Sequence, residues 1–188
     1  KKAMMKANTS SSLSLSILVL GLLWMCLLAS AHAQGQQQAP GALPNQLVLG
    51  LVNAIRAQGF NTAALIITYV RDVVRPPVTL LIPNDQAIAN VALSLPPLSA
   101  SPSLLRSLVQ AHMVPSNLSF SDLQALPVNT LIPTFHTGTR LRITSNTRND
   151  YMIENAHVLG KDICPNIADF LTCFGISQVF NVSGLFPN

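Results

Sequence analysis

The side chains best suited to acid–base or nucleophilic chemistry are scattered along this chain. His112, His136 and His157 could each act as a general base, but none has a nucleophile at a suggestive spacing. General acid–base and nucleophilic catalysis both need such groups within hydrogen-bond reach. We therefore predict that the chain is not an enzyme and uses no cofactor. His112 is interpreted as a structural residue at a helix end, where it favours the negative end of the helix dipole.

The N-terminal segment has the features of a secretory signal peptide. Three lysines precede an apolar run over residues 13–28, and Ala31-His32-Ala33 is a small-x-small cleavage site. An uncleaved membrane anchor is the alternative, but the run is short for a bilayer span and contains polar residues. We predict a signal peptide over residues 1–33, a flexible Gln- and Pro-rich tail over 34–45 and one domain over 46–188. The mature protein would be secreted and extracellular, without a membrane anchor.

Removing the signal peptide also removes most of the charge imbalance. The full chain has 11 Lys and Arg residues against 7 Asp and Glu residues, and loss of Lys1, Lys2 and Lys6 leaves 8 against 7. The one local cluster of arginines, Arg140, Arg142 and Arg148, has no aromatic residues between its members and is interpreted as a solvated hairpin face. We expect no nucleic-acid partner.

Two cysteines remain after signal cleavage, Cys164 and Cys173. An even pair in a chain sent to an oxidising compartment favours a disulfide over free thiols. A metal site would need two further ligands at a suitable spacing, so we expect no bound metal. In the chain-entropy model, closing such a small loop contributes about 2–3 kcal/mol.

Two sequons lie in the predicted mature chain and are candidate sites of N-glycosylation. They are Asn117-Leu118-Ser119, in a loop context after Pro115, and Asn181-Val182-Ser183, beside an apolar strand.

Residues 78–88 carry the clearest structural signal. Residues 78–82 are uncharged and mostly apolar, with β-branched side chains at three positions, which predicts a fully buried strand. Pro83 ends the strand because it has no N–H for the ladder. Asn84 or Asp85 is then expected to cap a short helix that runs to about residue 91.

Helical periodicity surrounds this strand, and strand periodicity follows. Apolar residues recur at helical spacing over 47–55, 61–74 and 102–112, with Gly59, Asn61 and Ser101 as end signals, and 119–122 has capping-box spacing. From residue 129 the period changes to two, which predicts strands over 130–132, 140–144, 151–153, 157–159 and 174–180. Helices followed by strands predict an α+β domain.

The order of these blocks resembles the fasciclin-like (FAS1) domain family, close to the plant fasciclin-like proteins. The first family block is matched by Thr79, Pro83, Asp85 and Ala87, the middle block by a leucine-rich helix that runs into His112, and the last block by residues 174–180 with Gly175. The match covers residues 47–186 in the family's order. Phe174 stands where the last block often has His, and Ala111 precedes His112, so integrin binding is not expected.

The resemblance implies a single FAS1-like domain with N-terminal helices packed on a β-rich wedge or sandwich. It also implies a non-catalytic, cell-adhesion type module of the extracellular matrix or cell wall. The expected partners are polysaccharide, glycoprotein or another copy of the chain. The alternative function is a carrier of a small molecule or lipid, since the high apolar content could line a pocket instead of only filling a core.

Overall fold

The computed structural model describes residues 41, 43–92, 101–147, 150–164 and 169–180 of the 188-residue chain. The predicted signal peptide and Asn181 lie outside these residues. The helices are α2 (Asn45–Ala57), α3 (Asn61–Tyr69), α4 (Asp85–Ala92), α5 (Pro102–Ala111) and α6 (Phe120–Ala125), with the short 3₁₀ helix η1 (Arg71–Val73). The strands are β1 (Val78–Pro83), β2 (Met113–Val114), β3 (Leu131–Pro133), β4 (Arg140–Thr147), β5 (Asp150–Ile153), β6 (Ala156–Asp162) and β7 (Leu171–Ile176).

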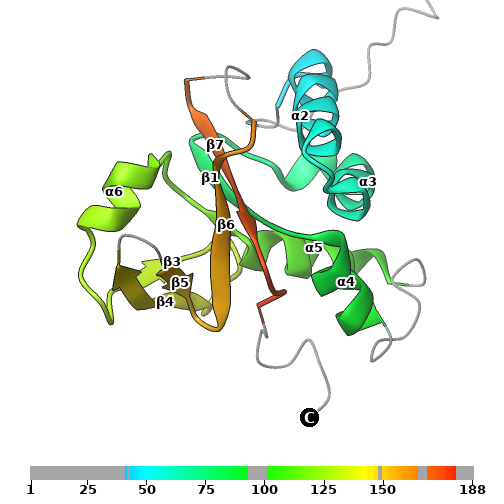
Figure 1. Ribbon diagram of the computed structural model, residues 1–188. Helices are drawn as coiled ribbons and strands as arrows, with labels where there is room; N and C mark the ends of the chain where they lie inside the picture. The colour runs from blue at the N-terminus through cyan, green and yellow to red at the C-terminus, as the bar shows by residue number, and fades with distance from the viewer. Residues whose placement is uncertain (1–40, 42, 93–100, 148–149, 165–168, 181–188) are drawn as a thin grey trace, which may run out of the picture. The chain divides into compact units, whose positions relative to one another are not determined.

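The strands form one seven-stranded sheet in the order β2-β1-β7-β6-β5-β4-β3. The pair β1–β7 is parallel, and the other neighbouring strands are antiparallel. Beyond β3, the backbone N–H of Phe135 donates to the carbonyl of Met113 in β2 at 2.9 Å. The two ends of the sheet therefore come together, and the sheet is barrel-like (Figure 1).

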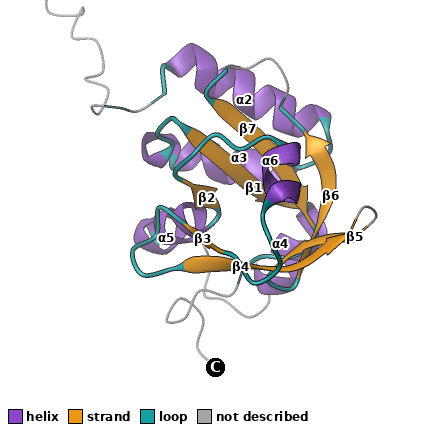
Figure 2. Cartoon of the chain, turned by 90° about the vertical axis from the view of Figure 1, so that its left-hand side faces the viewer, coloured by secondary structure: helices purple, strands orange, loops and turns teal. Residues whose placement is uncertain are grey.

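The central pair β1–β7 separates two apolar cores. Side chains alternate along a strand, so Val78, Leu80 and Ile82 point into a core formed with α2–α5, whereas Leu81 points into a second core with α6 and β3–β5. In Figure 1, α6 lies on one side of β1 and β7 and the helices α2 and α3 lie on the other, and in Figure 2, turned by 90°, α6 lies in front of these strands. Burial on both faces explains why residues 78–82 are apolar without alternation.

The predicted α+β class is confirmed, and most element boundaries agree. β1 ends at Pro83 as expected, and Gly59 follows the end of α2 with a φ of +87°. Ser119 and Asp122 form the predicted capping box at α6.

Several boundaries differ from the prediction, among them the ends of β4 and β6, which each lie three residues later than predicted. The final strand is β7, Leu171–Ile176, which starts three residues and ends four residues earlier than predicted. It starts where Leu171 pairs with Val78 of β1, and the apolar residues after Ile176 pack without ladder partners. α3 ends at Tyr69 and gives way to η1. Leu43 is buried against the helical core, so the folded domain includes part of the predicted tail.

Candidate functional site

An apolar groove lies on the helical side of the sheet, between α3, α4, α5 and the end of β1. Its volume is about 50 Å³. The lining is aliphatic apart from His112, and consists of Ala63, Ile66, Ile67, Leu80, Leu81, Ile82, Pro83, Ile88, Leu108, Val109, His112, Met113 and Val179. A space of this size holds a small aliphatic group and is too small to enclose a lipid chain. It therefore does not favour the alternative function, a carrier of a small molecule or lipid.

His112 lies in the wall of this groove at the C-cap position of α5 and is buried. Its Nε2 accepts a hydrogen bond from the backbone N–H of Phe180 at 3.0 Å. Nε2 therefore carries no proton, so Nδ1 holds it and donates to the carbonyl of Leu108 at 2.8 Å. The ring also stacks on the ring of Phe180, with 4.7 Å between centroids.

Burial lowers the pKa of His112 from 6.5 to about 4, although the hydrogen bond with the Leu108 carbonyl opposes the shift. The expected position at a helix end is correct, and the Nδ1–H bonds to Leu108, one of the last carbonyls of α5. The neutral ring also joins α5 to the segment that follows β7.

The outer face of α3 continues the groove onto the surface. Leu65 and Tyr69 lie one helical turn apart with 48% and 72% of their surface exposed, and the half-buried Ile66 connects them to the groove. α3 has no charged residue. Surface helices ordinarily carry polar and charged residues on the outer face, so this face has the composition of a contact surface. Leu65 belongs to the apolar helical repeat over residues 61–74, yet it lies on the exposed side of the helix.

Asp85 fixes the start of α3. Its carboxylate accepts hydrogen bonds from the backbone N–H groups of Asn61 and Thr62, at 3.2 and 2.8 Å. Its own helix α4 is capped by Asn84, whose side chain accepts from the N–H of Ala87 at 2.7 Å. Asn61, predicted as the cap of its helix, is instead its first residue and is capped by Asp85.

The carboxylate of Asp85 is held ionised by these contacts. Partial burial raises its pKa, but the hydrogen bonds from Thr62 and Asn61 outweigh this and leave the pKa below its ordinary value. A charged acceptor at the first turn of α3 also complements the positive end of the helix dipole.

Gly175 lets α3 approach the sheet. A Cβ at this position would lie 2.5 Å from Cζ of Phe60, the residue that precedes α3. Only a glycine allows the Phe60 ring to pack directly on β7. Of the predicted motif residues, Asp85 and Gly175 thus position α3, while Pro83 and His112 line the groove.

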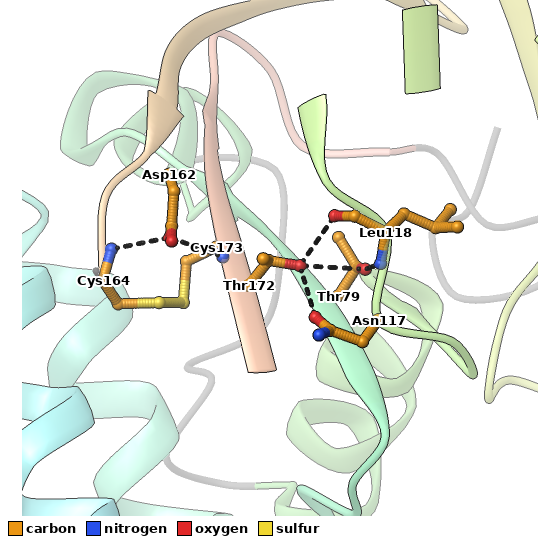
Figure 3. Close-up of a disulfide and its surroundings, with 7 residues drawn as sticks. All are labelled: Thr79, Asn117, Leu118, Asp162, Cys164, Thr172 and Cys173. Atoms are coloured by element: carbon orange, nitrogen blue, oxygen red, sulfur yellow. Dashed lines mark hydrogen bonds between the residues drawn. A yellow bond between two sulfur atoms is a disulfide. The ribbon is translucent and has the colours of Figure 1, made fainter. Parts of the chain in front are cut away.

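Thr79 lies on the opposite face of β1 and serves a different purpose. Its hydroxyl donates to the carbonyl of Ser116 at 2.7 Å and accepts from the N–H of Leu118 at 2.8 Å. In β7, the hydroxyl of Thr172 donates to the carbonyl of Leu118 or to Oδ1 of Asn117, at 2.8 and 3.0 Å (Figure 3). The two threonines attach the sequon loop to the central strands.

Asn117 lies exposed in this loop, and its side-chain N–H donates to the carbonyl of Asp169 at 2.6 Å. An exposed sequon is compatible with the predicted glycan, which stays a prediction.

Cys164 and Cys173 are joined in a disulfide, with 5.5 Å between their Cα atoms. Oδ1 of Asp162 accepts hydrogen bonds from the backbone N–H groups of both cysteines, at 3.1 and 3.2 Å (Figure 3). Asp162, Cys164 and Cys173 come close enough to share a metal ion, but sulfurs joined to each other cannot supply thiolate ligands.

The remaining histidines make local contacts. Nδ1 of His136 lies 2.8 Å from the hydroxyl of Thr139, and Nδ1 of His157 lies 2.7 Å from the carboxylate of Asp150. Throughout the described ranges, no hydroxyl or thiol hydrogen-bonds Nε2 of either ring. The same part of the chain has no helix both long and apolar enough to cross a membrane.

Comparison with known proteins places this geometry in a family. The family model described as the fasciclin domain matches residues 51–179. A FAS1 domain-containing protein of Selaginella moellendorffii is 30% identical over 139 residues, which are 74% of this chain and 51% of that protein. A FAS1 domain pair from the insect cell adhesion molecule Fasciclin I has the same fold, with a TM-score of 0.56 at 13% identity, over 73% of this chain and 52% of that one. The chain therefore spans about half the length of these relatives, and it belongs to the fasciclin (FAS1) domain family.

Proposed function

We propose that this chain is a secreted, non-catalytic interaction module of the extracellular matrix or cell wall. FAS1 domains are adhesion-type modules. The observation that carries the proposal for this chain is the uncharged outer face of α3, where Leu65 and Tyr69 adjoin the apolar groove. Exposed apolar residues that continue into a groove are typical of contact surfaces.

The chemistry of this surface favours a protein contact over a direct sugar contact. The groove offers aliphatic side chains and almost no hydrogen-bonding groups, because both nitrogens of His112 are already engaged. A sugar ring needs several hydrogen bonds, whereas an aliphatic side chain needs none. The favoured partner is therefore the polypeptide of a matrix glycoprotein, with another copy of this chain or a wall polysaccharide as the alternatives.

A binding screen with surface variants tests the proposal. The mature, glycosylated protein is screened against immobilised matrix glycoproteins and wall polysaccharides, and its self-association is measured by analytical ultracentrifugation. The double variant Leu65→Ser/Tyr69→Ser is expected to weaken glycoprotein binding at least tenfold without lowering the melting temperature. Leu159→Ser is the matched control, because Leu159 is similarly exposed (53%) but lies on β6.

Two results would contradict the proposal. One is the absence of any binding or self-association by the unaltered protein. The other is an equal loss of binding in Leu159→Ser and in the α3 variant, since the α3 face would then have no special part.

A further inference from the structure

One wall of the groove is joined to α5 by a hydrogen bond from a backbone N–H to a histidine ring. After β7 ends at Ile176, the N–H of Ser177 bonds to the carbonyl of His157. In residues 178–180, the N–H of Phe180 donates to Nε2 of His112, and the side-chain oxygen of Gln178 accepts from the side chain of Asn155 at 3.3 Å. Val179, between these points, lines the groove.

Nε2 of His112, which accepts the hydrogen bond from Phe180, is the one atom of this contact that can take up a proton. A protonated Nε2 is a donor, so it would face the N–H of Phe180 donor to donor and lose the bond. The ring would then carry a charge in an apolar wall, which is unfavourable unless the ring reaches water. Opening of residues 177–180 provides that access, because Phe180 covers the ring by stacking.

No neighbouring charge compensates the protonated ring. α3, β1, β2 and residues 177–180 carry no acidic or basic side chain within their described residues apart from the exposed Tyr69. On α5, Arg106 pairs with Asp72, and on α4, Asp85 binds the start of α3. His136, whose backbone N–H bonds to Gln110 of α5, has its Nδ1 within 2.8 Å of the Thr139 hydroxyl.

We infer that His112 is an acid-sensitive latch on the groove: protonation of its ring releases residues 177–180 and remodels the groove wall while the sheet stays folded. The consequence for partner binding rests on the proposed function, but the latch itself does not. The latch would make the groove a surface whose shape depends on the acidity of the surroundings.

Hydrogen exchange of single amides tests the latch. The exchange of the Phe180 amide is measured by NMR between pH 7 and 4.5, corrected for the intrinsic rate, together with the amides of Leu80 and Ile82 in β1. The population that is open at Phe180 is expected to rise about tenfold per pH unit below pH 6.5, because the open state binds one more proton. The β1 amides should keep their protection over this range.

Two variants and a probe dye complete the test. In His112→Gln, the side-chain oxygen can accept from Phe180 but does not titrate, so the pH dependence at Phe180 should disappear. His157→Gln should leave it unchanged, because His157 contacts Ser177 only through its backbone while its exposed side chain pairs with Asp150. Binding of the dye 1-anilinonaphthalene-8-sulfonate should rise over the same pH range in the unaltered protein and in His157→Gln only.

Exchange measurements on the unaltered protein test the latch even if His112→Gln does not fold. A Phe180 amide whose opening is independent of pH, or one that opens only together with β1, would overturn the latch. The absence of any partner in the binding screen would overturn the proposed function and leave these exchange measurements as they are, so the two failures can be told apart.

Discussion

Asp85 and His112 each bond to backbone groups of a segment far from their own helix. Asp85 lies at the start of α4 and holds the start of α3, whereas His112 ends α5 and holds the segment after β7. Both contacts satisfy backbone N–H groups that helix ends or strand ends leave without partners. Single side chains therefore fix the position of the elements that surround the groove.

The substitution Asp85→Ala is expected to lower the free energy of unfolding by about 1 kcal/mol through the lost cap of α3. The lost protection should appear in hydrogen exchange at the first turn of α3. The difference in the free energy of unfolding between Asp85→Ala and the unaltered protein should shrink as the pH falls. The stabilising form is the ionised carboxylate, whose pKa is lowered in the folded state.

Asn84→Ala is the matched control for this prediction, since Asn84 caps α4. It should expose the first turn of α4 to exchange and leave α3 protected. If Asp85→Ala weakened α4 instead of α3, the assignment of the two caps would be wrong.

At the scale of elements, the start of α3 packs on β7 where the ring of Phe60 lies against Gly175, which has no side chain. Phe60 is buried over Gly175, and the added Cβ would overlap the ring. Gly175→Ala is expected to lower stability by about 1–3 kcal/mol by forcing α3 away from the sheet. Denaturation in urea measures this loss.

A second substitution separates this overlap from a general effect of alanine on the strand. The smaller side chain in Phe60→Leu leaves room for the Cβ, so Gly175→Ala should be less damaging in a Phe60→Leu background than alone. Additive losses in the double variant would mean that the contact between the ring and the strand is not the cause.

The disulfide secures the loop between β6 and β7. The double substitution Cys164→Ala/Cys173→Ala is expected to lower the free energy of unfolding by about 2–3 kcal/mol, since the bridge closes a loop with a sequence separation of 9. Reductant should destabilise the unaltered protein by a similar amount and leave the double variant unchanged. A reductant effect of equal size in both proteins would refute this interpretation.

At the scale of the whole molecule, acid should weaken the fold in two stages. The pKa of His112 is about 4 in the folded state against 6.5 when the ring is exposed, so the unfolded chain binds the additional proton between these values. The contribution of His112 is fully present above pH 6.5 and is lost as the pH falls to about 4, by about 3 kcal/mol. Urea denaturation of the unaltered protein and of His112→Gln at pH 7, 5.5 and 4.5 measures it.

Below about pH 4, protonation of carboxylates lowers the free energy of unfolding further. The pKa of Asp72 is lowered by its hydrogen bond from Arg106, and that of Asp122 by its hydrogen bonds in the capping box. In His112→Gln the first stage should be absent and the second should remain. A flat profile for the unaltered protein between pH 6.5 and 4 would show that His112 does not have its depressed pKa.

Much of the fold could be predicted from local sequence, because strong local signals agree with the tertiary structure. Residues 78–83 are apolar on both faces and are followed by proline, and the capping box at Ser119 is complete within four residues. The end of the final strand was predicted four residues late, since its apolar residues continue past Ile176 into a segment that packs in the cores without a strand partner.

The site was less predictable, because its residues gain their roles from distant partners. Leu65 fits the helical repeat of buried residues as well as Ile66 does, and only the direction from which the sheet approaches leaves it exposed. Asp85 and Asn84 are both good helix caps, and nothing local shows that they cap two different helices.

By itself, the sequence determined the α+β class, the buried strand β1 and the pairing expected of Cys164 and Cys173. These features depend on composition, periodicity and spacing. The tertiary structure alone decided that His112 is neutral, that Gly175 admits the Phe60 ring and that α3 presents an apolar face beside a groove. The protonation of a ring, the room for a Cβ and the exposure of a side chain are all fixed by atoms that folding brings from elsewhere in the chain.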